Sequence, residues 1–129
     1  GLEGTRSGIP VLGICVGVEK NAQEEKVFDL VQRTNELLEI SGSVNRDTVV
    51  ANGDYVGKGY GKPTEGMIEA VQLMACKEGI LLDPVYSGKG MAGLIDLIRK
   101  KHFSKSENIV FLHTGGSVAL FAYRNILAT

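Results

Sequence analysis

Two glycine-rich loops in the second half of the chain carry hydroxyl side chains that can do chemistry. In the segment 109–116, an apolar run typical of a buried strand stops at a histidine, Thr114 and two glycines. In the segment 80–90, a similar run leads to Tyr86, Ser87 and a glycine-rich helix start. Such turns expose backbone N–H groups that can hold an anion, although neither has the Walker pattern or the dinucleotide-binding fingerprint. We expect both loops to meet at one edge of a parallel sheet and to hold a cofactor there.

Tyrosines in loops are the candidates for acid–base catalysis, namely Tyr55, Tyr60 and Tyr86. A phenol has an unperturbed pKa of about 10 and can act as an acid, or as a base beside a positive charge. The alternative is an amphipathic residue with a buried ring and a wet hydroxyl. Lys89 could form a Schiff base, but a lysine beside a glycine turn is usually exposed, and we expect that here. His113, at the end of a predicted strand, is expected to support the loop through hydrogen bonds.

Apolar runs alternate with helical patterns and must position these loops. Strands are predicted at 10–18, 47–51, 80–82 and 109–112, and helices within 21–42, 64–79 and 88–101. Asn21 and Glu24 resemble a capping box at the first helix, and Thr64 is a candidate cap for the second. The alternation predicts an α/β fold with three layers, in which a parallel sheet is covered by helices on both faces.

Composition limits the classes of partner. The chain has 129 residues, with 14 Lys plus Arg against 15 Asp plus Glu, which gives no electrostatic reason to expect nucleic acid or an anionic membrane. Cys15 and Cys76 have no metal-ligand spacing and are expected to be core thiols in a reducing cytoplasm. Residues 1–8 lack an initiator Met and read like a helix end, so we expect the chain to begin inside a larger domain.

Four segments taken together resemble one family, and they are 60–66, 78–89, 113–116 and 120–123. The family is the D-cysteine desulfhydrase and 1-aminocyclopropane-1-carboxylate deaminase group of pyridoxal-phosphate enzymes, which have the tryptophan-synthase-β fold (fold type II). The resemblance covers essentially the whole chain. It implies that residues 1–129 form the carboxyl-terminal portion of a catalytic domain whose Schiff-base lysine and phosphate loop lie outside this chain. It also implies pyridoxal 5′-phosphate as cofactor, a small amino acid as substrate and a homodimer.

Two positions distinguish the branches of this family. Deaminases resemble one another in having Glu and Leu where this chain has Ser87 and Thr114, whereas desulfhydrases have Ser or Thr at both positions. The resemblance implies that Thr114, Ser87 and Gly115 bind the cofactor, with the hydroxyls at its ring nitrogen. It implies that Tyr86, and secondarily Tyr60, orient the substrate or assist proton transfer.

The implied reaction is an α,β-elimination that converts D-cysteine to pyruvate, hydrogen sulfide and ammonia. Two alternatives on the same scaffold stay open, which are deamination of the cyclopropane amino acid and elimination of sulfite from L-cysteate. An alternative of another class is a non-catalytic fragment or a chain that completes a sheet with a partner.

Overall fold

The computed structural model describes residues 7–40 and 44–127 of the chain. Two parallel strands with a helix between them are followed by further helices, which confirms the α/β class. The elements are β1 (Leu12–Ile14), α1 (Lys20–Leu37), a 3-10 helix (Arg46–Thr48), β2 (Val50–Asn52), α2 (Glu65–Glu78), α3 (Ser87–Arg99), a second 3-10 helix (Ser117–Tyr123) and α4 (Arg124–Leu127). Within the described ranges, no helix is both long and apolar enough to cross a membrane.

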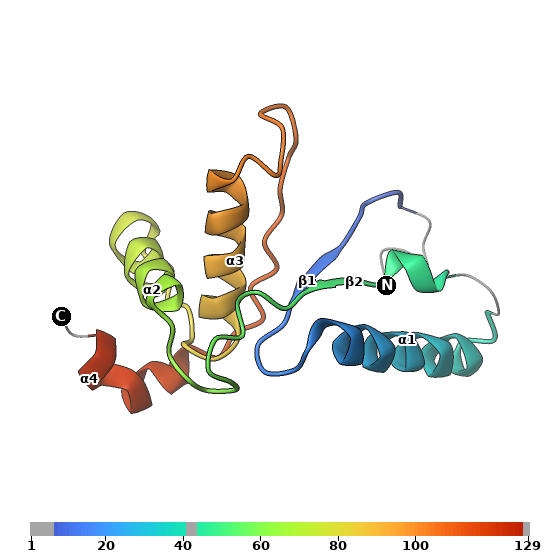
Figure 1. The fold of residues 1–129 in the computed structure, drawn as a ribbon, viewed down its shortest axis with the longest axis horizontal. Helices are drawn as coiled ribbons and strands as arrows, with labels where there is room; N and C mark the ends of the chain where they lie inside the picture. Colours follow the sequence, from blue (N-terminus) through green and yellow to red (C-terminus); the bar gives the residue numbers. More distant parts are fainter. Residues whose placement is uncertain (1–6, 41–43, 128–129) are drawn as a thin grey trace.

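The strands β1 and β2 form a parallel sheet between two helices. Leu12 pairs with Val50 and Ile14 with Asn52, and the ladder continues into the loop, because the N–H of Cys15 donates to the carbonyl of Asn52 over 2.8 Å. The helix α1 packs against β2 and α3 packs against β1, and Figure 1 shows the two strands lying between these helices. The three layers that were predicted are therefore present around this short sheet.

Two predicted strands do not form. The segments 80–82 and 109–112 have no strand pairing among the described residues. A strand needs a neighbour that completes its backbone hydrogen bonds, and neither segment lies in such a ladder. Leu81, Val110 and Leu112 are also exposed, so the prediction of buried strands was wrong for these residues. The two segments still meet, because the ring of His113 lies 3.0 Å from the carbonyl oxygen of Leu81.

The apolar core lies chiefly between α2 and α3. Its buried members are Met67, Ala70, Val71, Leu82, Met91 and Ala92. The predicted cap of α2 is confirmed, since the Thr64 hydroxyl accepts a hydrogen bond of 3.2 Å from the N–H of Met67. Cys15 is buried as predicted, but Cys76 is exposed. It shares the solvent side of α2 with Glu69 and Gln72, at helical spacing.

The amino-terminal end of α1 differs from the prediction. The helix begins at Lys20, and its cap residue Glu19 makes no side-chain capping bond, so Asn21 and Glu24 do not form a capping box. The carboxylate of Glu24 instead accepts a hydrogen bond of 2.9 Å from the N–H of Ala51 in β2. Because a buried strand N–H needs an acceptor, Glu24 joins the helix to the sheet rather than closing its own first turn. Apolar side chains that are nonetheless exposed are Val27, Leu30 and Leu37 in α1 and Leu38 directly after it.

Close packing at the start of α3 gives a test of this core. A Cβ placed at Gly88 would lie 2.6 Å from the carbonyl oxygen of Asp83 and 2.9 Å from a methyl of Val71, whereas a Cβ at Gly90 would lie 3.4 Å from the ring of Phe111. We expect Gly88→Ala to lower the free energy of unfolding by about 1–3 kcal/mol through overpacking. Gly90→Ala is the control, since Ala favours a helix by about 1 kcal/mol over Gly. Urea unfolding of the full-length protein measures both, and equal effects would contradict this account.

Candidate active site

Tyr60 and Tyr86 form a pair on the protein surface. Tyr60 lies in the loop between β2 and α2, and Tyr86 immediately precedes α3. Their rings pack edge to face with centroids 5.8 Å apart, and their hydroxyl groups hydrogen-bond to each other. Both side chains are about half exposed, at 58% and 51%. The hydrogen bond to Tyr86 raises the pKa of Tyr60, so this hydroxyl keeps its proton at neutral pH. The pair is therefore an accessible proton donor.

A buried carboxylate, which the sequence analysis missed, fixes the start of α3. Asp83 is 1% exposed, and its two oxygens accept hydrogen bonds from the N–H groups of Val85 (2.8 Å), Tyr86 (2.7 Å) and Ser87 (2.7 Å). The Ser87 hydroxyl donates to the same carboxylate over 2.6 Å and accepts from the N–H of Asp83 over 2.8 Å. The signal that could have revealed this turn is the Asp shortly before a helix start, because Asp side chains accept hydrogen bonds from backbone N–H groups a few residues on. The single proton of the Ser87 hydroxyl is already engaged here.

Ionisation of Asp83 is favoured by this turn. Burial by itself would raise the pKa of Asp83, but the hydrogen bonds from Ser87, Tyr86 and Val85 outweigh it, and the pKa of the carboxyl is lowered. The negative charge also lies at the amino end of α3, where the helix dipole favours it.

The Thr114 loop packs on the same turn. Gly115 and Gly116 both have φ in the left-handed region, at +95° and +93°, and a Cβ at Gly116 would lie 3.0 Å from the Asp83 carboxyl carbon. The N–H of Gly115 donates to Nδ1 of His113 over 2.9 Å, so the ring proton is on Nε2 and is donated to the carbonyl of Leu81. This confirms His113 as a support for the loop. Thr114 is exposed, and its hydroxyl has no hydrogen-bond partner among the described residues.

Lys89 is buried, which contradicts the prediction that it is exposed. Its side chain is 0% exposed, and its Nζ donates to the carbonyl oxygens of Val56 (2.7 Å), Gly59 (2.9 Å) and Val16 (3.3 Å). Burial lowers the pKa of Lys89. The prediction failed because it considered only the glycine turn, whereas the acceptors come from segments distant in the sequence. All three N–H donors are occupied, so this amine is not free to react with a carbonyl.

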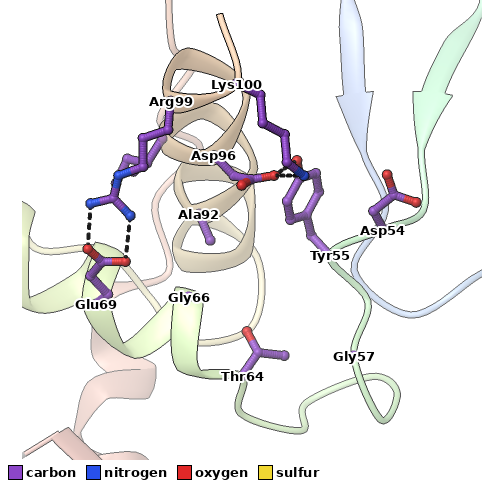
Figure 2. A pocket seen from close by; sticks show the side chains of 11 residues that line it. Asp54, Tyr55, Gly57, Thr64, Gly66, Glu69, Ala92, Asp96, Arg99 and Lys100 are labelled. Carbon is purple, nitrogen blue, oxygen red and sulfur yellow. Dashed lines mark hydrogen bonds and ion pairs between the residues drawn. The ribbon is translucent and has the colours of Figure 1, made fainter. Parts of the chain in front are cut away.

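A cleft of about 360 Å³ lies elsewhere, between the loop after β2 and the helices α2 and α3. Figure 2 shows Arg99 directed at Glu69, and Lys100 and Tyr55 directed at Asp96. The Tyr55 hydroxyl donates to Asp96 over 2.6 Å, and Arg99 binds Glu69 through two bonds of 2.9 and 2.6 Å. Burial and the bond to Asp96 raise the pKa of Tyr55 to about 12. Tyr55 is therefore held as a structural donor, and neither Tyr60 nor Thr114 lines this cleft.

The fold and these loops define an α/β domain in which two loops pack on the Asp83 turn and carry the exposed hydroxyls of Tyr86 and Thr114. The family model for "Pyridoxal-phosphate dependent enzyme" matches residues 4–115. The chain belongs to this family, whose cofactor is pyridoxal phosphate. Its structure is also similar to a solved structure described as a crystal structure analysis of the ACC deaminase homologue, with 35% sequence identity and a TM-score of 0.83. The match covers 98% of this chain and 37% of that chain, which supports fold type II.

The ionised state of Asp83 predicts how stability depends on pH. Its folded pKa lies below the unfolded value of about 3.9. The stability that ionisation contributes is therefore complete above about pH 4 and is lost as the pH falls through the folded pKa. We expect Asp83→Asn to remove this dependence and to lower the free energy of unfolding at neutral pH by about 1–3 kcal/mol, because backbone N–H groups lose an acceptor.

Urea unfolding at a series of pH values measures both effects. Asp47→Asn, a charge change at an exposed position, is the matched control. If the free energy of unfolding falls with decreasing pH as steeply in Asp83→Asn as in the wild type, the turn does not depend on the charge of Asp83.

Proposed function

We propose that this chain is the carboxyl-terminal portion of a pyridoxal-phosphate enzyme that eliminates hydrogen sulfide from D-cysteine. The net reaction converts D-cysteine and water to pyruvate, hydrogen sulfide and ammonia. Three observations support a longer catalytic domain, which are the 37% coverage of the similar chain, the exposed apolar side chains of α1, and the unpaired segments 80–82 and 109–112. The proposal includes a homodimer in the cytoplasm, as the family resemblance and composition suggest.

The residues present fit the ring end of the cofactor. Thr114 offers an exposed hydroxyl, and a Cβ at Gly115 would meet nothing within 4 Å, so the backbone there is open to a flat ligand. The cofactor, when bound, supplies an electron sink for negative charge at the substrate α-carbon. Thr114 would hydrogen-bond to the ring nitrogen, and a hydroxyl there stabilises no positive charge on the ring, unlike a carboxylate. Gly115 would let the ring approach.

Ser87 takes a more indirect part in this proposal. Its proton is donated to Asp83, and the Asp83 turn packs against Gly116. Ser87 would therefore set the position of the loop that carries Thr114, and it could reach the ring nitrogen only by giving up the bond to Asp83.

The tyrosine pair would act on the departing sulfur. Tyr86, whose main chain is tied to Asp83, would donate a proton to the sulfur as the carbon–sulfur bond breaks, and Tyr60 would orient Tyr86 and resupply the proton. The observation that carries the proposal is that this pair and the unpartnered hydroxyl of Thr114 converge on one buried turn, with Ser and Thr at the two branch positions.

A second candidate is deamination of the cyclopropane amino acid, because the similar solved structure is described as an ACC deaminase homologue. Sulfite elimination from L-cysteate differs only in the leaving group. The alternative of another class is a non-catalytic or complementing chain, and turnover by the isolated chain would argue against it.

Substrate preference separates these functions. We expect the full-length enzyme to release hydrogen sulfide and pyruvate from D-cysteine with a kcat/KM at least about tenfold above that for the cyclopropane amino acid or L-cysteate, a difference of about 1.4 kcal/mol in transition-state stabilisation. The measurement is pyruvate formation with each substrate, alongside 2-oxobutanoate for the cyclopropane acid. A preference for the cyclopropane acid would overturn the proposed branch.

The role of Thr114 can be tested at one exposed position. Thr114→Val removes the hydroxyl while keeping the shape, and Thr114→Ser keeps the hydroxyl. We expect Thr114→Val to lower kcat for D-cysteine by about tenfold or more, because a hydrogen bond to the cofactor is lost. The kcat of Thr114→Ser is expected to stay within about threefold of the wild-type value. Equal activity of the two variants would remove Thr114 from the site. Ser87→Glu is a poorer probe, because it would bring a second carboxylate to Asp83.

A further inference from the structure

Lys89 is the one fully buried cation in the described part of the chain, and its three N–H donors meet three acceptors. Its Nζ lies 2.7 Å from the carbonyl oxygen of Val56, 2.9 Å from that of Gly59 and 3.3 Å from that of Val16. A lysine ammonium has three donors and no acceptor, so the three carbonyls satisfy it completely. No ion pair joins it to a carboxylate among the described residues.

These carbonyls belong to the two segments that place Tyr60. Val56 and Gly59 lie in the loop that delivers Tyr60, and Gly59 directly precedes it. Val16 precedes Gly17, against which the Tyr60 ring packs so closely that a Cβ at Gly17 would lie 2.8 Å from the Tyr60 Cβ. Lys89 lies three residues after Tyr86 in the chain. Its side chain therefore links the helix start that carries Tyr86 to both segments that place Tyr60.

A buried cation is costly at this place. The first turn of a helix carries a partial positive charge, so the helix dipole disfavours an ammonium there. Removing an ammonium from water also costs free energy, which the carbonyls only partly offset. An apolar side chain of the same length would avoid both costs but would leave the three carbonyl oxygens without this donor. What an apolar side chain cannot do is fix the direction of three carbonyls at once.

We infer that Lys89 is a positioning residue, whose ammonium holds the backbone at Val16, Val56 and Gly59 so that the Tyr60 hydroxyl meets that of Tyr86. The inference concerns the geometry of the pair and holds whichever amino acid is the substrate. It rests on the proposed function only in treating the pair as part of the active site.

The first test is Lys89→Met in the full-length protein, with Lys58→Met as the matched control at an exposed position of the same loop. We expect amide hydrogen exchange in residues 53–62 to become about tenfold faster or more in Lys89→Met, and to stay unchanged in the control. Exchange in the sheet and in α2 is expected to change much less. A uniform rise over all these segments would mean that Lys89 only stabilises the core, and would overturn the inference.

A spectroscopic readout follows the tyrosine pair directly. Tyrosinate formation is followed by ultraviolet titration in the wild type and in Lys89→Met, each with and without Tyr60→Phe. The difference between each protein and its Tyr60→Phe form isolates the ionisation of Tyr60. The bond to Tyr86 raises the pKa of Tyr60, so loss of the pair in Lys89→Met is expected to return this pKa toward about 10. An unchanged titration of Tyr60 would contradict a positioning role even if activity fell.

Chemical rescue keeps the inference testable if Lys89→Met folds poorly. Lys89→Ala lacks the atoms that propylammonium supplies, and added propylammonium is expected to restore exchange protection in residues 53–62 and the raised pKa of Tyr60. Tetramethylammonium carries the same charge without an N–H donor and is expected to have no effect. Equal rescue by both ions, or by neither, would overturn the inference. None of these readouts depends on turnover, so they are separable from a failure of the proposed reaction.

Discussion

The buried carboxylate of Asp83 orders the region in which the proposed chemistry takes place. Its two oxygens gather donors from three consecutive backbone N–H groups and one hydroxyl, and this sets where α3 begins and where Tyr86 emerges. The Thr114 loop then packs on the same carboxyl group, an approach that only a glycine at position 116 permits. Because the bonds converge on one charged group, the turn is satisfied without help from a strand ladder.

In this region two ions are buried, while the hydroxyls of three other side chains are exposed. Asp83 and Lys89 are both buried, Asp83 bound by backbone N–H groups and the Ser87 hydroxyl and Lys89 by backbone carbonyls, whereas Tyr60, Tyr86 and Thr114 present hydroxyls at the surface. A buried ion with all its hydrogen bonds made is costly to move, so such ions are suited to holding loops in position. An exposed hydroxyl can exchange its partner for a ligand at little cost. The side chains that hold the site and those that can act in it are therefore distinct.

Local sequence signals were reliable where the structure they report is itself local. Thr64 caps α2, and His113 supports the loop that contains the glycine pair through its hydrogen bonds. The failures concern residues whose partners are distant in sequence. Glu24 was predicted to be part of a capping box, but its carboxylate binds β2. Lys89 was predicted to be exposed, but it is buried and binds carbonyl oxygens of two other segments. Strand formation at 109–112 also failed, since an apolar run gives no information about whether a neighbour is present to pair with it.

The two buried ions also explain how the loops hold their places beside so short a sheet. Two strands of three residues each contribute few ladder bonds, and a two-stranded sheet is marginal by itself. Asp83 ties the start of α3 to the Thr114 loop, and Lys89 ties the same helix to the loops after β1 and β2. Asp83 holds the turn that leads into α3 and Lys89 lies in the first turn of this helix, so a displacement of α3 would move both tyrosines and the Thr114 loop together. The relative geometry of the hydroxyls would then survive small shifts of the surrounding layers, because α3 and its ions carry them as one unit.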